Sequence, residues 1–128
     1  MRAIVLGGCL ALGCGSGKPA DTRCAASTAA VGAALEQLDK VDEYHPTDCT
    51  RIGYVAGMVN GHEYGIGMAS SGEDRAGLDA QAVLTRTAGE LFNTLNNCTP
   101  AAMPGLRATA RNLLTKARGD LDRVCTKR

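Results

Sequence analysis

Few side chains in this sequence have the type and spacing for metal chemistry. His62 has soft-ligand neighbours, because Met58 lies four residues before it and Met68 follows six residues later. A His–Met set of this kind suits copper, but soft-metal sites normally need three or four ligands. No further ligand stands at a recognisable spacing. We therefore expect no cofactor, and these three residues carry the alternative interpretation as a small-ligand or metal-binding protein.

The residue types of hydrolytic enzymes lack the spacing that catalysis requires. Ser70 and Ser71 precede Gly72 in a polar stretch without a nucleophile-elbow motif. The acidic pairs, 42–43 and 73–74, fall at expected helix ends, and the second pair suits a helix N-terminus. No glycine-rich phosphate loop ends in Lys-Ser or Lys-Thr. The sequence therefore predicts a non-enzymatic protein.

The N-terminal residues have the composition of an export signal. Arg2 precedes an apolar run from Ala3 to Leu12. A basic start, about ten apolar residues and a small residue at the cleavage point are typical of a signal peptide. The run is shorter than the roughly 20 residues that span a bilayer. The stretch Leu10-Ala11-Leu12-Gly13-Cys14 resembles a bacterial lipobox.

That resemblance implies cleavage before Cys14 and attachment of diacylglycerol to its sulfur; the alternative is a plain secretory signal with Cys14 as an ordinary thiol. We expect a signal peptide at 1–13, a lipidated tether at 14–21 and a helical domain at 22–128. Gly15, not Asp, follows the cysteine. This implies a lipoprotein of the outer membrane facing the periplasm in a Gram-negative host. In a Gram-positive host it implies the outer face of the plasma membrane.

Four cysteines remain once Cys9 and Cys14 are set aside: Cys24, Cys49, Cys98 and Cys125. An even number in an exported chain indicates two disulfides. Their spacings are wide and contain no C-x-x-C, which argues against zinc, redox and haem-attachment motifs.

Apolar residues recur at helical spacing along the rest of the chain. The expected helices run from about 22 to 41, 47 to 70, 74 to 97 and 104 to 124. The expected core positions are Cys24, Thr28, Val31, Leu35 and Leu38 in the first helix; Leu84, Ala88, Leu91, Leu95 and Cys98 in the third; and Leu106, Ala110, Leu113, Ala117, Leu121 and Val124 in the fourth.

The second segment allows two interpretations. Its glycine ridge (Gly53, Gly57, Gly61 and Gly65) recurs every four residues. Each glycine inside a helix costs about 1 kcal/mol relative to alanine, so a helix here needs a compensating close approach. The alanine-rich face of the first helix, around Ala26 and Ala30, could supply it. The alternative is a β-hairpin that turns at Asn60-Gly61, which would make the fold α+β.

The cysteines fit one bundle topology. In an up-down-up-down bundle, the first helix begins where the fourth ends, and the second begins where the third ends. Bonded cysteines need Cα atoms within about 7 Å. Of the three possible pairings, only Cys24–Cys125 with Cys49–Cys98 meets this condition. The sequence therefore predicts an all-α, disulfide-stapled four-helix bundle.

Charge and two tyrosines indicate where a partner would bind. The formal net charge of +1 falls to 0 without Arg2, which argues against nucleic acid. Residues 104–128 hold seven basic residues against two acidic ones. The candidate partner-binding residues are Arg107, Arg111 and Arg118 on one side of the fourth helix, with Tyr54 and Tyr64 beside the glycine ridge.

A short stretch resembles a known family. Cys49-x4-Tyr54-Val55-x-Gly57-Met58, followed by Gly61, is similar to a helix of cysteine-containing secreted type VI immunity proteins. The match covers about a dozen residues, and no functional residues follow from it. Small helical pilotin lipoproteins of secretion systems are similar in size, anchor and disulfide use. We therefore expect a lipid-anchored envelope protein that binds another envelope protein as an adaptor, pilotin or inhibitor.

Overall fold

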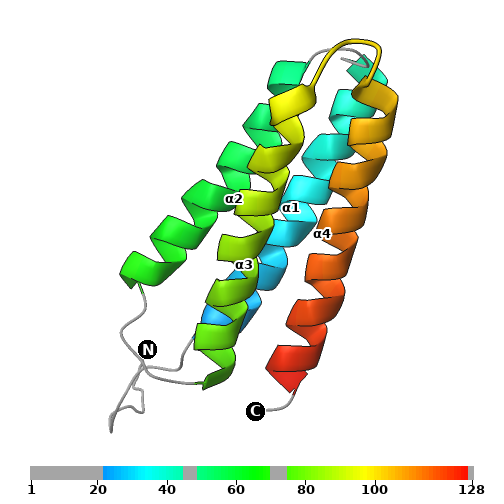
Figure 1. Ribbon diagram of the computed structural model, residues 1–128. Coiled ribbons are helices and arrows are strands. Elements are labelled where there is room, and N and C mark those ends of the chain that lie inside the picture. Colours follow the sequence, from blue (N-terminus) through cyan, green and yellow to red (C-terminus); the bar gives the residue numbers. More distant parts are fainter. Residues whose placement is uncertain (1–21, 45–48, 70–74, 127–128) are drawn as a thin grey trace, which may run out of the picture.

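The chain folds into four antiparallel helices (Figure 1). The computed structural model describes residues 22–44, 49–69 and 75–126, with side chains in 22–40, 49–65 and 75–126. The elements are α1 (Arg23–Tyr44), α2 (Cys49–Ala69), α3 (Arg75–Thr94), the 3-10 turn η1 (Leu95–Asn97) and α4 (Met103–Thr126). No strand occurs in these ranges. The predicted all-α four-helix bundle is confirmed.

The alternative hairpin at Asn60-Gly61 is wrong, because both residues lie inside α2. The burial pattern explains the result. Ile52, Val55 and Val59 are fully buried, and their spacing of three and four residues places them on one face of a helix. The packing of this face outweighs the low helix propensity of the glycines.

Helix ends lie within a few residues of the expected positions. α1 continues to Tyr44, three residues beyond the expected end at Val41. α4 begins at Met103, and Pro104 follows in its first turn, where a missing N–H costs nothing. Between η1 and α4, the Thr99 hydroxyl accepts a hydrogen bond from the Ala102 amide at 3.2 Å.

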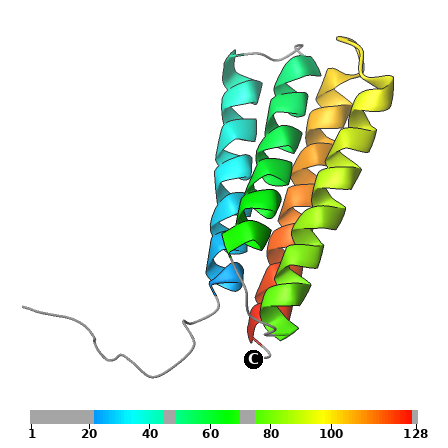
Figure 2. The same cartoon turned by 90° about the vertical axis from the view of Figure 1, so that its left-hand side faces the viewer.

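The four helices occupy the corners of a distorted square. α1 packs against α2 and α4, and α3 packs against the same two helices. α1 and α3 also meet across the short diagonal, whereas α2 and α4 lie at distant corners. Figure 1 shows that α2 leans away from α3 and α4 toward its C-terminal end, and Figure 2 shows the bundle turned by 90°, with α2 beside α1.

The core consists mainly of small and aliphatic side chains. Eight of its twenty buried hydrophobic residues are alanines, and no aromatic side chain among the described residues is buried. The expected core positions need local correction. In α1, Thr28 is exposed and Leu35 half-buried, while Ala30 and Ala34 are buried; in α4, Leu114 is fully buried, whereas Leu106, Leu113 and Val124 are half-buried. The buried stripes of α1 and α4 are therefore rotated slightly from their predicted centres.

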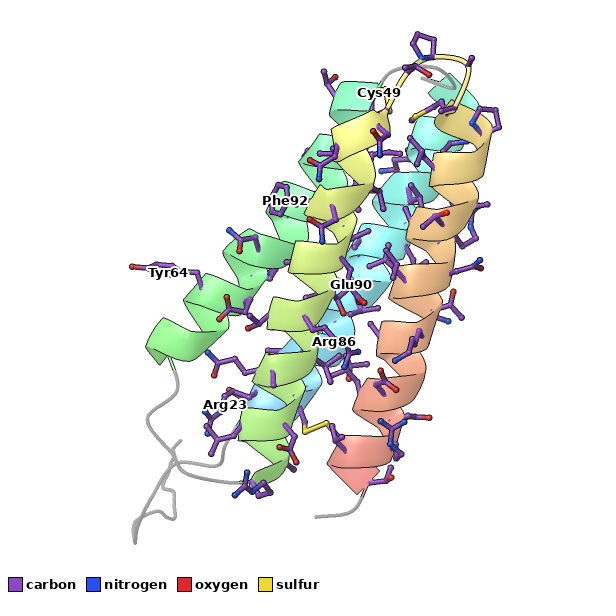
Figure 3. All side chains as sticks on the ribbon, in the orientation of Figure 1. Arg23, Cys49, Tyr64, Arg86, Glu90 and Phe92 are labelled. Atoms are coloured by element: carbon purple, nitrogen blue, oxygen red, sulfur yellow. A yellow bond between two sulfur atoms is a disulfide. The ribbon has the colours of Figure 1, made fainter. Side chains whose placement is uncertain are left out.

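Two disulfides close the bundle at opposite ends, with the predicted pairing (Figure 3). Cys24 and Cys125 have Cα atoms 5.9 Å apart and join α1 to α4. Cys49 and Cys98 have Cα atoms 6.0 Å apart and join the start of α2 to the segment after η1. All four cysteines in the described part of the chain are bonded.

Removing either disulfide should destabilise the fold strongly. Replacing both cysteines of one pair by serine opens a loop of 101 residues (Cys24–Cys125) or 49 residues (Cys49–Cys98). The chain-entropy model gives a loss of about 4–5 kcal/mol in the free energy of unfolding, slightly more for the longer loop. Urea unfolding followed by far-UV circular dichroism measures it, with the disulfide-bonded wild-type protein as the reference. If each pair of substitutions lowers the free energy of unfolding by less than about 1 kcal/mol, the fold does not depend on its disulfides for stability.

Candidate functional site

The outer face of α2 is the main exposed surface with aromatic side chains. It comprises Tyr54, Gly57, Gly61, Tyr64 and Gly65, all of them exposed. The side chain of Tyr64 points away from the bundle (Figure 3), and Tyr64 is 69% exposed. The guanidinium of Arg51 lies 5.1 Å from the centre of the Tyr54 ring, which holds that ring by a cation–π contact.

The glycine ridge does not make the close approach that its spacing predicted. A methyl group added at Gly53 would lie 3.5 Å from Leu95 Cδ1, which is an ordinary contact. At Gly57, Gly61 and Gly65 it would meet nothing within 4 Å. The predicted packing against the alanines of α1 is therefore wrong, and most of the ridge faces outward.

Phe92 of α3 extends the exposed apolar surface toward α2. Its side chain lies on the side of α3 that borders α2 (Figure 3), and Phe92 is 41% exposed. α2 and α3 pack side by side. One partner could therefore contact Phe92 and the outer face of α2 together.

A polar chain holds the C-terminal half of α2 to the bundle. Arg23 Nη1 donates to Gln81 Oε1 at 3.4 Å, and Gln81 Nε2 donates to Glu63 Oε2 at 3.2 Å. The chain joins α1, α3 and α2 in that order. Val59 is the last fully buried side chain of α2 in its described part, because residues 60–65 are exposed or half-buried. Over residues 60–65, α2 is therefore attached mainly by polar contacts.

Two of the three candidate metal ligands, His62 and Met58, have described side chains on α2. His62 is exposed and Met58 is half-buried on the same helix. The side chain of Met68 lies outside the described residues. Within the described ranges, no group of three or more His, Cys, Asp or Glu side chains could hold a metal ion.

The three arginines lie together on α4, as their spacing predicted. Arg111 Nη2 donates to Asp39 Oδ1 of α1 at 2.7 Å, which places this flank beside α1. Arg107 is half-buried and Arg118 is exposed. α4 occupies the corner distant from α2, so the arginines and the tyrosines do not form one surface.

A carboxylate that was not predicted from the sequence is buried between α3 and α4. Asp120 is 6% exposed. Its Oδ2 accepts hydrogen bonds from Arg86 Nη2 at 2.6 Å and Lys116 Nζ at 2.9 Å, and its Oδ1 accepts one from Arg123 Nη1 at 2.9 Å. The hydrogen bonds from Lys116 and Arg123 hold the pKa of Asp120 far below its usual range. The helical spacing of 116, 120 and 123 was the available signal.

The expected anchor lies outside the described residues. Cys14, the signal peptide at 1–13 and the tether at 14–21 precede residue 22, where the description begins. Among the helices of the described part, none combines the length and the hydropathy of a membrane span.

Comparison of the chain with protein-family models, with curated proteins and with solved structures gave no match. The function of the protein is therefore inferred from the residues and geometry of this chain.

Replacing Asp120 by Asn should destabilise the protein at neutral pH. The substitution removes the charge that Lys116, Arg123 and Arg86 share, and we expect a loss of about 1–3 kcal/mol in the free energy of unfolding. Because the folded-state pKa is lowered, the stabilisation is fully present above pH ~4 and is lost as pH falls toward the folded-state pKa. Urea unfolding at pH 7 and pH 3 measures the difference in the free energy of unfolding between the wild type and the variant. This difference should be smaller at pH 3.

The control for this substitution is Asp122→Asn, which changes an exposed carboxylate on the same helix. It should alter the stability by less than about 0.5 kcal/mol. Equal effects of the two substitutions would mean that the contacts of Asp120 contribute nothing specific.

Proposed function

We propose that this protein is a lipid-anchored cell-envelope protein that binds another envelope protein without catalysing a reaction. The observation that carries the proposal is the outer face of α2. This face exposes two tyrosines and three glycines, although the helix forms part of a small, disulfide-stapled domain.

The composition of α2 supports a role in binding. Residues 52–61 contain no charged side chain. Exposed helical glycines cost about 1 kcal/mol each relative to alanine, and those at 57, 61 and 65 gain no contact inside the domain. Exposed tyrosines supply large contact areas with few rotatable bonds, as in many protein interfaces. A partner that packs closely on this face would use both features.

The anchor is supported by the N-terminal sequence. Arg2, the apolar run and the lipobox-like stretch that ends at Cys14 fit an exported, lipid-modified chain. The disulfides fit the same compartment, because they persist in oxidising environments such as the bacterial periplasm. A membrane-attached domain without a metal-ligand group in its described part suits an adaptor, a pilotin or an inhibitor.

Mass spectrometry of the protein from its native host tests the anchor. We expect an N-terminal Cys14 that carries lipid, because the lipobox directs both cleavage and acylation. Cys14→Ser should abolish the lipid mass and release the protein from membranes. A mature chain that begins elsewhere, or an unmodified Cys14, would remove the anchor from the proposal.

A side chain placed on the outer face of α2 should block the partner without harming the fold. Gly61→Leu adds a bulky group where nothing lies within 4 Å. We expect partner binding to weaken at least tenfold, because the leucine side chain prevents the partner from packing closely on the backbone of α2. The stability of the protein should rise slightly, because leucine has a better helix propensity than glycine. Photo-crosslinking in the host from position 64 identifies the partner, and titration with that partner measures the affinity.

The matched control is Gly32→Leu on α1. Gly32 is also helical and exposed, and a methyl group there would meet no described atom within 4 Å. The two variants gain the same side chain and similar helix propensity, so only their positions differ. Equal loss of binding in both variants, or none in Gly61→Leu, would show that the partner does not use the outer face of α2.

A further inference from the structure

Three cationic side chains converge at the border between α3 and α4. Arg86 comes from α3, and Lys116 and Arg123 come from consecutive turns of α4 on either side of Asp120. Arg86 Nη2 and Lys116 Nζ contact the same oxygen of Asp120. One small anion could therefore reach both nitrogens. Figure 3 shows Arg86 and Glu90 on the side of α3 that borders α4.

The positive charge of this cluster is only partly neutralised. Asp120 supplies one negative charge, and Glu90 lies 3.7 Å from Arg86 Nε. Three cations therefore face two carboxylates. An arginine offers five N–H donors and a lysine three, and each contact with Asp120 uses one donor. Donors remain available for a second acceptor.

The carboxylate is covered while the cations stay accessible. The side chain of Asp120 is 9% exposed, whereas those of Arg86, Lys116 and Arg123 are 43%, 62% and 58% exposed. Gly119 stands between Lys116 and Arg123, and a methyl group there would meet nothing within 4 Å. No side chain from that position fills the space between the two cations.

We propose that Arg86, Lys116 and Arg123 form a binding site for a phosphate group. A phosphate dianion presents several oxygens to donors from different directions, which suits two guanidinium groups and an ammonium group. The phosphate can belong to a free anion or to a lipid headgroup, and the site stands independently of the partner surface on α2.

Titration of the native disulfide-bonded protein with inorganic phosphate, against sodium chloride of equal ionic strength, tests the site. Two-dimensional NMR should show saturable shifts for the amides around residues 86, 116 and 123. The double variant Lys116→Gln with Arg123→Gln should bind phosphate at least tenfold more weakly. No saturable, phosphate-specific change in the wild type would overturn the proposal.

The matched control is Lys40→Gln with Arg118→Gln. Both side chains are exposed on other flanks of the bundle, and the net charge changes by the same amount. This variant should retain the wild-type affinity for phosphate. An equal loss in both double variants would show that phosphate responds only to total charge, which would also overturn the proposal.

The Asp120→Asn variant distinguishes a phosphate-binding site from an ion network that only stabilises the fold. Removing the competing carboxylate should strengthen phosphate binding several-fold, and phosphate should restore part of the lost thermal stability. A purely structural network predicts the loss of stability with no gain in affinity, and that result would count against the site.

Vesicles identify the source of the phosphate. The test uses the Cys14→Ser variant, which lacks the lipid. Its recruitment to vesicles that contain phosphatidic acid, but not to phosphatidylcholine alone, assigns a lipid headgroup. Binding of inorganic phosphate without recruitment to either vesicle assigns a free anion.

Discussion

The two disulfides constrain every other feature of this bundle. The buried hydrophobic residues include eight alanines and no aromatic side chain among the described residues, so each helix contributes little apolar area to the core. Burial stabilises by about 25 cal/mol per Å², which limits what small side chains can supply. Cross-links at both ends lower the entropy of the unfolded chain instead. A helix as rich in glycine as α2 can then persist, because Cys49 holds its first turn.

Much of the topology could be predicted from the sequence, because the cysteines report on helix ends. Each of the four cysteines lies near the end of a helix. Only one pairing of these cysteines joins helix ends that are adjacent in an up-down-up-down bundle. The network around Asp120 could not be predicted in full. Lys116 and Arg123 are its helical neighbours at i−4 and i+3, but Arg86 lies 34 residues away and approaches only through the packing of α3 on α4. Burial of a charge is a tertiary property.

The four-residue repeat of the glycine ridge explains why the predicted close packing of these glycines against α1 was wrong. A helix turns 100° per residue, so each step of four advances the stripe by about 40°. Gly53 begins beside Leu95 at the α3 border, and the later glycines rotate out toward solvent. Small residues are buried instead in α1 and α3, which contact each other across the short diagonal; they include Ser27 and Ala30 in α1 and Gly77 and Ala80 in α3.

The distribution of charge separates the two proposed surfaces. α2 carries no charge along residues 52–61, whereas α4 carries the cations that meet at Asp120. These helices occupy distant corners of the square, so a protein seated on the outer face of α2 leaves Arg86, Lys116 and Arg123 open. Two helices can couple the proposed surfaces, because α1 and α3 each pack against both α2 and α4. Of these two, α3 is the one that contributes Phe92 to one surface and Arg86 to the other.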